Sequence, residues 1–191
     1  QFKLFRNKGA AGGFTFHDVT ADAGFVLTPA VAFAWAGGAC AADYDKDGYL
    51  DLMVALNLSD GRWRLLHSEP NPVPGDISDP TYTPRIFVDT TVAAGLVPPV
   101  EPNPGESWMP TFVDLDRDGY PDLHQNIDFD FDHLWKNNGD GTFTDIATAT
   151  GMNGAPVAEG NEMGAALGDI DGDLDLDFHL TNVKQGGVFK D

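Results

Sequence analysis

The chain has 191 residues, 42% of them hydrophobic, which suits one medium-sized domain with a core of its own. Thirty acidic residues against eleven basic ones give a formal net charge of −19, which argues against binding to nucleic acid or to anionic membranes. No apolar run reaches the roughly 18 residues of a membrane-spanning helix. No signal peptide is recognisable at Gln1, which favours a mature product or a fragment of a longer chain.

Short apolar segments separated by turn residues predict an all-β fold along the whole chain. An inner strand over 31–42 is built mainly from small residues, which suits close packing. Residues 68–84 contain five prolines and no hydrophobic period. They predict a surface insertion and a candidate partner-binding feature. The other expected strands cover residues 1–7, 14–20, 52–58, 62–67, 108–113, 134–137, 143–147, 163–167 and 178–181, with a turn at 138–141.

Three nine-residue segments carry aspartate at positions 1, 3, 5 and 9, and we name them loop 1 (43–51), loop 2 (114–122) and loop 3 (169–177). Such crowded carboxylates repel one another unless a cation lies between them. Oxygen ligands at this density suit Ca²⁺, and glycine at position 6 of loops 1 and 2 permits a sharp turn. In loops 1 and 2 the predicted ligands are the side chains of Asp43, Asp45, Asp47, Asp51, Asp114, Asp116, Asp118 and Asp122, with the backbone carbonyls of Tyr49 and Tyr120.

Loop 3 departs from this pattern because Leu174 replaces the glycine at position 6. A branched residue is costly in a left-handed conformation, so the loop is either distorted or one residue shorter than the common pattern. Asp169, Asp171 and Asp173 are predicted ligands in either case. The closing ligand is Asp177 in the first alternative and Asp175 in the second. The sequence therefore predicts two calcium sites and a candidate third.

The EF-hand shares the opening of these loops but closes with a bidentate glutamate at position 12. Here that position is occupied by Val54, Gln125 and Leu180, and an apolar, strand-like segment follows each loop. The loops are therefore not EF-hands.

The segments between the loops also repeat. Residues 4–7, 14–20 and 23–25 match residues 134–137, 143–147 and 150–152, and a shorter copy covers residues 86–91 and 94–96. Loops and spacers together resemble the FG-GAP/VCBS repeats of integrin-α-like, calcium-binding β-propellers, in particular the bacterial secreted type. The resemblance covers nearly the whole chain. It implies that residues 1–191 form a single β-propeller domain, or a fragment of one, with about three blades of four strands each.

The same resemblance implies a function. It suggests a non-catalytic, calcium-stabilised scaffold for protein–protein interaction or adhesion, as part of a larger exported protein or assembly. Partners would be other subunits or cell-surface and matrix proteins. An extracellular or periplasmic location agrees with the calcium loops, because cytosolic free calcium is too low to fill sites of modest affinity. With three bound ions the net charge becomes about −13, so the surface stays acidic.

One alternative function is carbohydrate binding by a lectin-like propeller, with exposed aromatic side chains as stacking platforms. For Trp35, Trp108 and Trp135 we favour packing, because these residues lie in or beside the repeated segments. Trp63, between Arg62 and Arg64, is the best candidate for an exposed contact.

A second alternative is an extracellular hydrolase that uses an acidic cluster. Asp128, Asp130 and Asp132 alternate with aromatic residues and could share one face with His124 or His133, as a transition-metal or acid–base site. The competing interpretation is an acidic sheet edge that discourages strand addition. Turn or capping roles are expected for Asp18, Asp89 and Asp145, burial as a small apolar residue for Cys40, and no role is assigned to His17, His67 or His179.

Overall fold

The computed structural model describes residues 3–9, 13–25, 35–58, 61–76, 79, 82–97, 106–128, 130–152 and 162–182. This part of the chain confirms the all-β prediction, since it consists of antiparallel strands and one short helix. The elements are β1 (Phe5–Asn7), β2 (Phe16–Asp18), β3 (Trp35–Ala42), β4 (Asp51–Leu58), β5 (Gly61–Pro70), β6 (Arg85–Asp89), β7 (Glu106–Val113), β8 (Asp122–Asp128), β9 (His133–Asn137), β10 (Phe143–Asp145), α1 (Ala147–Thr150), β11 (Glu162–Gly168) and β12 (Asp177–Asn182).

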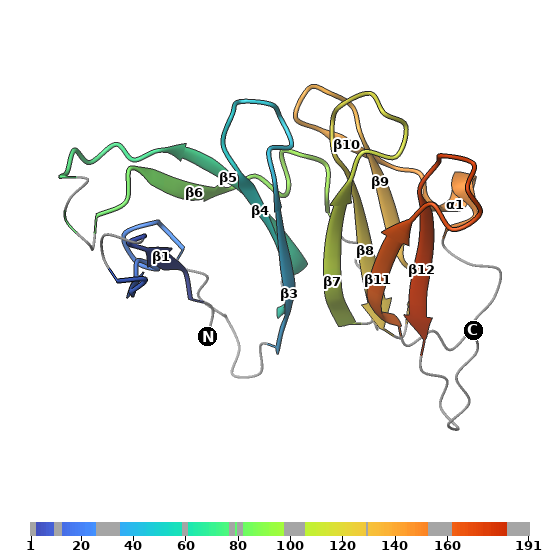
Figure 1. Ribbon diagram of the computed structural model, residues 1–191, viewed down its shortest axis with the longest axis horizontal. Coiled ribbons are helices and arrows are strands. Elements are labelled where there is room, and N and C mark those ends of the chain that lie inside the picture. Colours follow the sequence, from blue (N-terminus) through green and yellow to red (C-terminus); the bar gives the residue numbers. More distant parts are fainter. Residues whose placement is uncertain are drawn as a thin grey trace.

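The strands form four open sheets (Figure 1). Two sheets have four strands each in simple up-and-down order, β3-β4-β5-β6 and β7-β8-β9-β10. The other two are the pairs β1-β2 and β11-β12. The first strands β3, β7 and β11 contact one another in series, β3 with β7 and β7 with β11. The three sheets that contain β3, β7 and β11 are therefore arranged side by side around their first strands.

The two four-stranded sheets share one register, which shows that they are structural repeats. Leu52 pairs with Leu66 in the first sheet, and Leu123 pairs with Trp135 at the same step of the second. The first hairpin of each repeat contains a register shift, between residues 36 and 39, 107 and 110, and 162 and 164. Such bulges bend and twist a strand, so they set the same curvature in each repeat.

Close packing of β3 on β7 explains the small residues of the inner strand. A Cβ atom added to Gly37 would lie 2.6 Å from the backbone oxygens of both Ser107 and Trp108. No side chain fits at that distance, so glycine is required here. The prediction that this strand needs small residues for close packing is confirmed at Gly37 and Gly38, whereas Ala39 and Ala41 are exposed.

A repeated turn after the last strand of a repeat joins neighbouring sheets. The backbone N–H of Phe87 donates to the carbonyl of Ala23 (2.8 Å), and that of Phe143 donates to Ala94 (2.9 Å). Within the turns, aspartate side chains accept from the backbone N–H two residues later, at 3.1, 3.0 and 2.9 Å. The aspartates are Asp18, Asp89 and Asp145, so their predicted turn role is confirmed.

The main core lies between the two four-stranded sheets and includes Met53, Trp63, Leu123 and Trp135. Trp63 is fully buried, and its indole N–H donates to the carbonyl of Leu96 at 2.7 Å. The expectation that Trp63 is an exposed contact is therefore wrong. Its ring lies edge-on to Trp135, with centroids 5.1 Å apart. Pairing of β5 with β4 directs the indole toward the next sheet. The prediction of an exposed side chain had rested on the two neighbouring arginines in the sequence.

Replacing Trp63 with phenylalanine is expected to lower the free energy of unfolding by about 2 kcal/mol. The substitution removes buried ring volume and leaves the Leu96 carbonyl without its donor. Trp108→Phe is the matched control, because its indole nitrogen is buried and has no acceptor among the described residues. Urea denaturation should show a cost below about 1 kcal/mol for this control. Equal costs for the two variants would contradict the role of the Trp63 hydrogen bond.

The start of the predicted insertion 68–84 differs in the structure. The strand β5 continues to Pro70, which pairs with Arg85, so the first residues of the proposed insertion 68–84 belong to a sheet.

The sole cysteine, Cys40, is partly buried against the core, and burial raises the pKa of its thiol to about 12. Among the described residues, no helix has the length and apolar character needed to cross a membrane.

Candidate metal centres

Each acidic loop connects the first two strands of its sheet. Loop 1 joins β3 to β4, loop 2 joins β7 to β8, and loop 3 joins β11 to β12. The three loops lie at the same end of the molecule (Figure 1). Closely grouped potential ligand atoms, all within 4.8 Å of one another, occur in each loop. The groups are Asp43, Asp45 and Asp47 in loop 1, Asp114, Asp116 and Asp122 in loop 2, and Asp169, Asp171 and Asp177 in loop 3.

The three loops share one pattern of internal hydrogen bonds. The position 1 carboxylate accepts through Oδ2 from the backbone N–H of position 6, at 2.9, 2.9 and 3.0 Å. Positions 3 and 5 accept from the N–H two residues later at 2.8 to 3.2 Å. Position 9 accepts through Oδ2 from the N–H of position 2 at 3.2, 3.1 and 2.8 Å. These local Asx-type bonds follow from the aspartate spacing, which is why the sequence specifies the turn.

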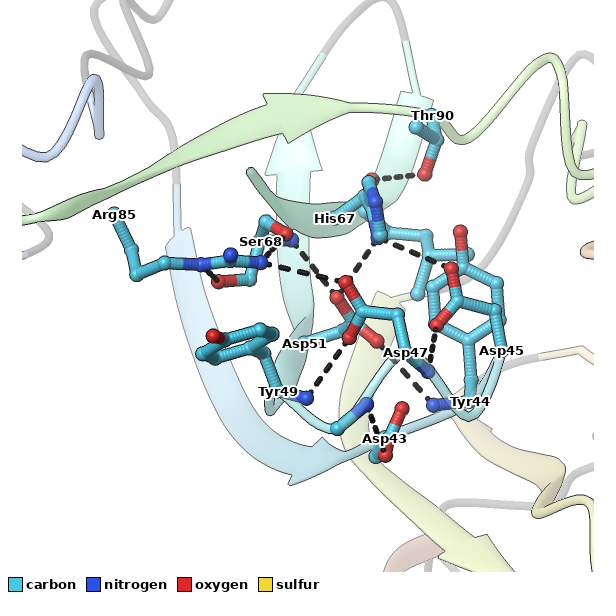
Figure 2. A network of polar contacts seen from close by, with 12 residues as sticks. Asp43, Tyr44, Asp45, Asp47, Tyr49, Asp51, His67, Ser68, Arg85 and Thr90 are labelled. Carbon is cyan, nitrogen blue, oxygen red and sulfur yellow. Dashed lines mark hydrogen bonds and ion pairs between the residues drawn. The ribbon is translucent and has the colours of Figure 1, made fainter. Parts of the chain in front are cut away.

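The position 9 aspartates also bind the third strand of the sheet. Asp51 accepts from the backbone N–H of Ser68 at 2.8 Å, and Asp122 accepts from that of Asn137 at 2.9 Å (Figure 2 shows loop 1). Burial raises the pKa of both carboxyls, while the backbone hydrogen bonds oppose this change. Each of these residues therefore links the loop, the second strand and the third strand, in addition to its predicted role as a ligand.

The position 1 aspartates show whether the loops suit a cation. In Asp43 and Asp114 the Oδ1 atom is inaccessible to solvent, and no donor among the described residues reaches it. A buried carboxylate oxygen without a donor or a cation is unfavourable. The other aspartates of the same loop supply carboxylate oxygens beside it, the kind of ligand that Ca²⁺ prefers. Loops 1 and 2 therefore fit the predicted ion.

Loop 3 keeps the same conformation although its glycine has moved. Each loop has two residues with positive φ, at positions 4 and 6. In loops 1 and 2 glycine is at position 6, whereas in loop 3 Gly172 is at position 4 (φ 82°) and Leu174 is at position 6 (φ 75°). The hydrogen bond from Ile170 N–H to Asp177 is retained, while the Asp175 side chain pairs with Arg117 at 2.9 Å. The structure therefore places Asp177 at the closing position and leaves Asp175 outside the ligand group.

Loop 3 differs from the others in one further contact. The N–H of Gly172 donates to Oδ1 of Asp169 at 2.7 Å, so the atom that lacks a donor in loops 1 and 2 has one here. One acceptor position of this carboxylate is therefore already used. We expect loop 3 to be the weakest of the three candidate sites.

Leu174→Gly is expected to raise the free energy of unfolding by about 0.5–1 kcal/mol. The side chain is 76% exposed, so little buried area is lost, and glycine relieves the left-handed strain. The larger entropy of glycine in the unfolded chain offsets part of this gain. The control is Leu176→Gly, which should destabilise, because Leu176 does not have a positive φ. A loss of stability in both variants, measured by urea denaturation, would contradict the strain argument.

Cationic side chains approach loops 1 and 2 from other strands. Arg85 contacts Asp47 at 3.4 Å and lies over the Tyr49 ring, while Lys136 pairs with Asp116 and with Asp118 (3.2 Å). These cationic side chains offset part of the negative charge of the aspartates at positions 3 and 5. The backbone-carbonyl roles of Tyr49 and Tyr120 stay predictions.

Neighbouring loops also contact each other. Lys46, at position 4 of loop 1, lies 3.7 Å from the ring centroid of Tyr120, at position 7 of loop 2. Arg117, at position 4 of loop 2, pairs with Asp175, at position 7 of loop 3. Position 4 of one loop thus contacts position 7 of the next in both cases, which places the three loops in one continuous row.

His67 is a site residue to which the sequence analysis assigned no role. Its Nδ1 lies 3.0 Å from Asp51 Oδ1 and 3.6 Å from Asp45 Oδ2 (Figure 2). The histidine follows loop 1 by 16 positions and reaches it only because β5 pairs with β4. No local sequence motif signals this contact.

The second acidic region does not form the predicted face. Strand β8 ends at Asp128, and Asp128 and Asp132 are buried whereas Asp130 is only partly buried. Asp132 is buried and pairs with buried His124 at 3.0 Å, whereas His133 pairs with Asp145 at 2.7 Å. Of the alternative in which these aspartates lie with His124 or His133, the structure shows the pair of His124 with Asp132, whereas His133 pairs with Asp145 outside the cluster.

No protein-family model matches the chain, and the search of curated proteins found no match. The resemblance to FG-GAP/VCBS repeats therefore remains a prediction drawn from the residues.

Proposed function

We propose that this protein is a calcium-stabilised, propeller-type repeat scaffold of the FG-GAP/VCBS kind. The observation that carries the proposal is the inaccessible Oδ1 atom of Asp43 and of Asp114, which occupies the same position in two matching loops and has no donor among the described residues. A divalent cation in each loop would satisfy that oxygen and reduce the repulsion among the other carboxylates of the loop.

The chain's own residues would couple the ion to the sheet. Positions 1, 3 and 5 supply carboxylates from the turn, and position 9 adds a carboxylate that is hydrogen-bonded to the third strand. Bound calcium supplies a fixed positive charge and no reaction. Because the centres in loops 1 and 2 each link three strands of a sheet, their role is to hold that sheet in one rigid shape.

The repeat pattern supports a propeller. Each four-stranded sheet is an up-and-down meander, and the first strands lie next to one another. By the sequence repeat, β1 and β2 correspond to β9 and β10, the last two strands of a repeat. The loop positions make β11 and β12 correspond to the first two strands. Sheets of this kind bury their faces against neighbouring repeats, as propeller blades do.

A non-catalytic scaffold of this kind would present its surface to protein partners in an extracellular or periplasmic setting, where calcium is abundant. Two of the tryptophans considered as sugar-stacking platforms, Trp63 and Trp135, are buried in the core, which favours this proposal over the lectin alternative. The burial of the His124–Asp132 pair and the pairing of His133 with Asp145 favour it over the hydrolase alternative. Glycan-array binding or turnover of a polysaccharide by the calcium-loaded protein would contradict it.

Calcium titration of the metal-stripped protein tests the proposed centres. Isothermal calorimetry and native mass spectrometry should detect at least two bound ions. Asp43→Asn and Asp114→Asn should each remove one ion, while Asp22→Asn, an exposed change outside the loops, should remove none. Absence of calcium binding at millimolar concentration would overturn the proposal.

A further inference from the structure

Loop 1 differs from loop 2 in one side chain that comes from the third strand of the sheet. Leu66 and Trp135 occupy matching registers, so the next residues, His67 and Lys136, are structural equivalents. Both approach the carboxylates of their loops. Loop 2 therefore faces an ammonium group, which cannot bind a metal, while loop 1 faces an imidazole, which can.

The geometry around His67 suits a single metal ion. Its Nδ1, a carboxylate oxygen of Asp45 and one of Asp51 all lie within 4.8 Å of one another. The two measured separations from Nδ1 are 3.0 and 3.6 Å. Ligands about 2.0–2.2 Å from a common ion are separated by about 3.0 Å in octahedral and about 3.4 Å in tetrahedral coordination. The 3.0 Å separation matches the octahedral value, and the 3.6 Å separation is close to the tetrahedral value.

The surroundings hold this group in place. Asp51 is fully buried, and its carboxylate is oriented by the N–H groups of Ser68 and Tyr44. The His67 ring lies edge-on to the largely buried Tyr44 ring, with centroids 6.0 Å apart. In the same loop, Oδ1 of Asp43 is inaccessible and has no donor among the described residues, which is a separate sign that loop 1 suits a cation.

We propose that loop 1 is a mixed nitrogen–oxygen site that binds a borderline transition-metal ion, of the Zn²⁺ or Co²⁺ class, through His67 Nδ1, Asp45 and Asp51. Imidazole nitrogen favours such ions over Ca²⁺, which selects oxygen ligands. This inference rests on the proposed function, since it gives one of the metal centres a different metal preference. Binding requires the neutral ring to carry its proton on Nε2, so the His67–Asp51 hydrogen bond is exchanged for two metal–ligand bonds.

Cobalt titration of the full metal-stripped chain tests this assignment, followed by Co²⁺ visible absorption and by NMR shifts of the imidazole nitrogens. His67→Gln and His67→Lys are expected to weaken Co²⁺ binding roughly tenfold or more and to abolish the imidazole shift. His17→Gln is the control for binding at another histidine and should change neither signal. Lys136→His should create a second Co²⁺ site in loop 2.

The outcomes separate this inference from the proposed function. Calcium binding together with Co²⁺ affinity that is unchanged by His67→Gln would overturn the mixed site, leaving His67 as a hydrogen-bonding residue only, and would retain the calcium scaffold. Absence of calcium binding together with Co²⁺ affinity that depends on His67 would overturn the scaffold's calcium centres and retain the mixed site.

Discussion

Removing calcium with excess EDTA is expected to lower the free energy of unfolding by several kcal/mol. A ligand that binds only the folded state stabilises it by about 4 kcal/mol when present at 1,000 times its dissociation constant. Two matching loops fit such an ion, and without it their carboxylates face one another across a short turn. The inaccessible oxygens of Asp43 and Asp114 would then lack any partner among the described residues.

Thermal unfolding in calcium and in excess EDTA measures this difference. The double variant Asp43→Asn/Asp114→Asn should lose most of its dependence on calcium, because both first ligands are changed. Concentrated sodium chloride without calcium is the control for charge screening, and should restore only part of the stability. A melting temperature that is the same in calcium and in EDTA would contradict the prediction.

The local features of the site could be predicted because they depend on residues close in the sequence. Aspartates at positions 1, 3, 5 and 9 specify the turn through hydrogen bonds to the backbone of the same loop. The sequence alone left the closing ligand of loop 3 open. The structure shows that Gly172 at position 4 and Leu174 at position 6 both have positive φ, as the residues at these positions do in loops 1 and 2. Loop 3 therefore keeps the same geometry.

Long-range features could not be predicted, because they depend on strand register. His67 and Lys136 approach their loops only after the second and third strands pair. Trp63 is buried because the next repeat covers it, and the sequence around it gave no sign of that cover. The all-β repeat was predicted from the sequence. Closure of the four open sheets into a propeller remains a proposal.

Asp51→Ala is expected to lower the free energy of unfolding by about 3–5 kcal/mol even without metal. Its fully buried carboxylate accepts from the backbone N–H groups of Tyr44 and Ser68 and from His67. Truncation leaves these two backbone groups without their acceptor, at about 1–3 kcal/mol each, and opens a cavity at the start of β4. Relief of the buried charge offsets part of the loss.

Urea denaturation in EDTA separates this structural role of position 9 from metal binding. Asp47→Ala is the matched control in the same loop, because its carboxylate is more exposed and accepts from one backbone N–H at 2.8 Å. We expect that variant to cost about 1 kcal/mol or less. Asp51→Asn keeps one acceptor oxygen and should fall between the two. If Asp51→Ala lowers the free energy of unfolding in EDTA no more than Asp47→Ala does, then position 9 has no structural role apart from metal binding. The link between the loop and the third strand would then contribute nothing to stability.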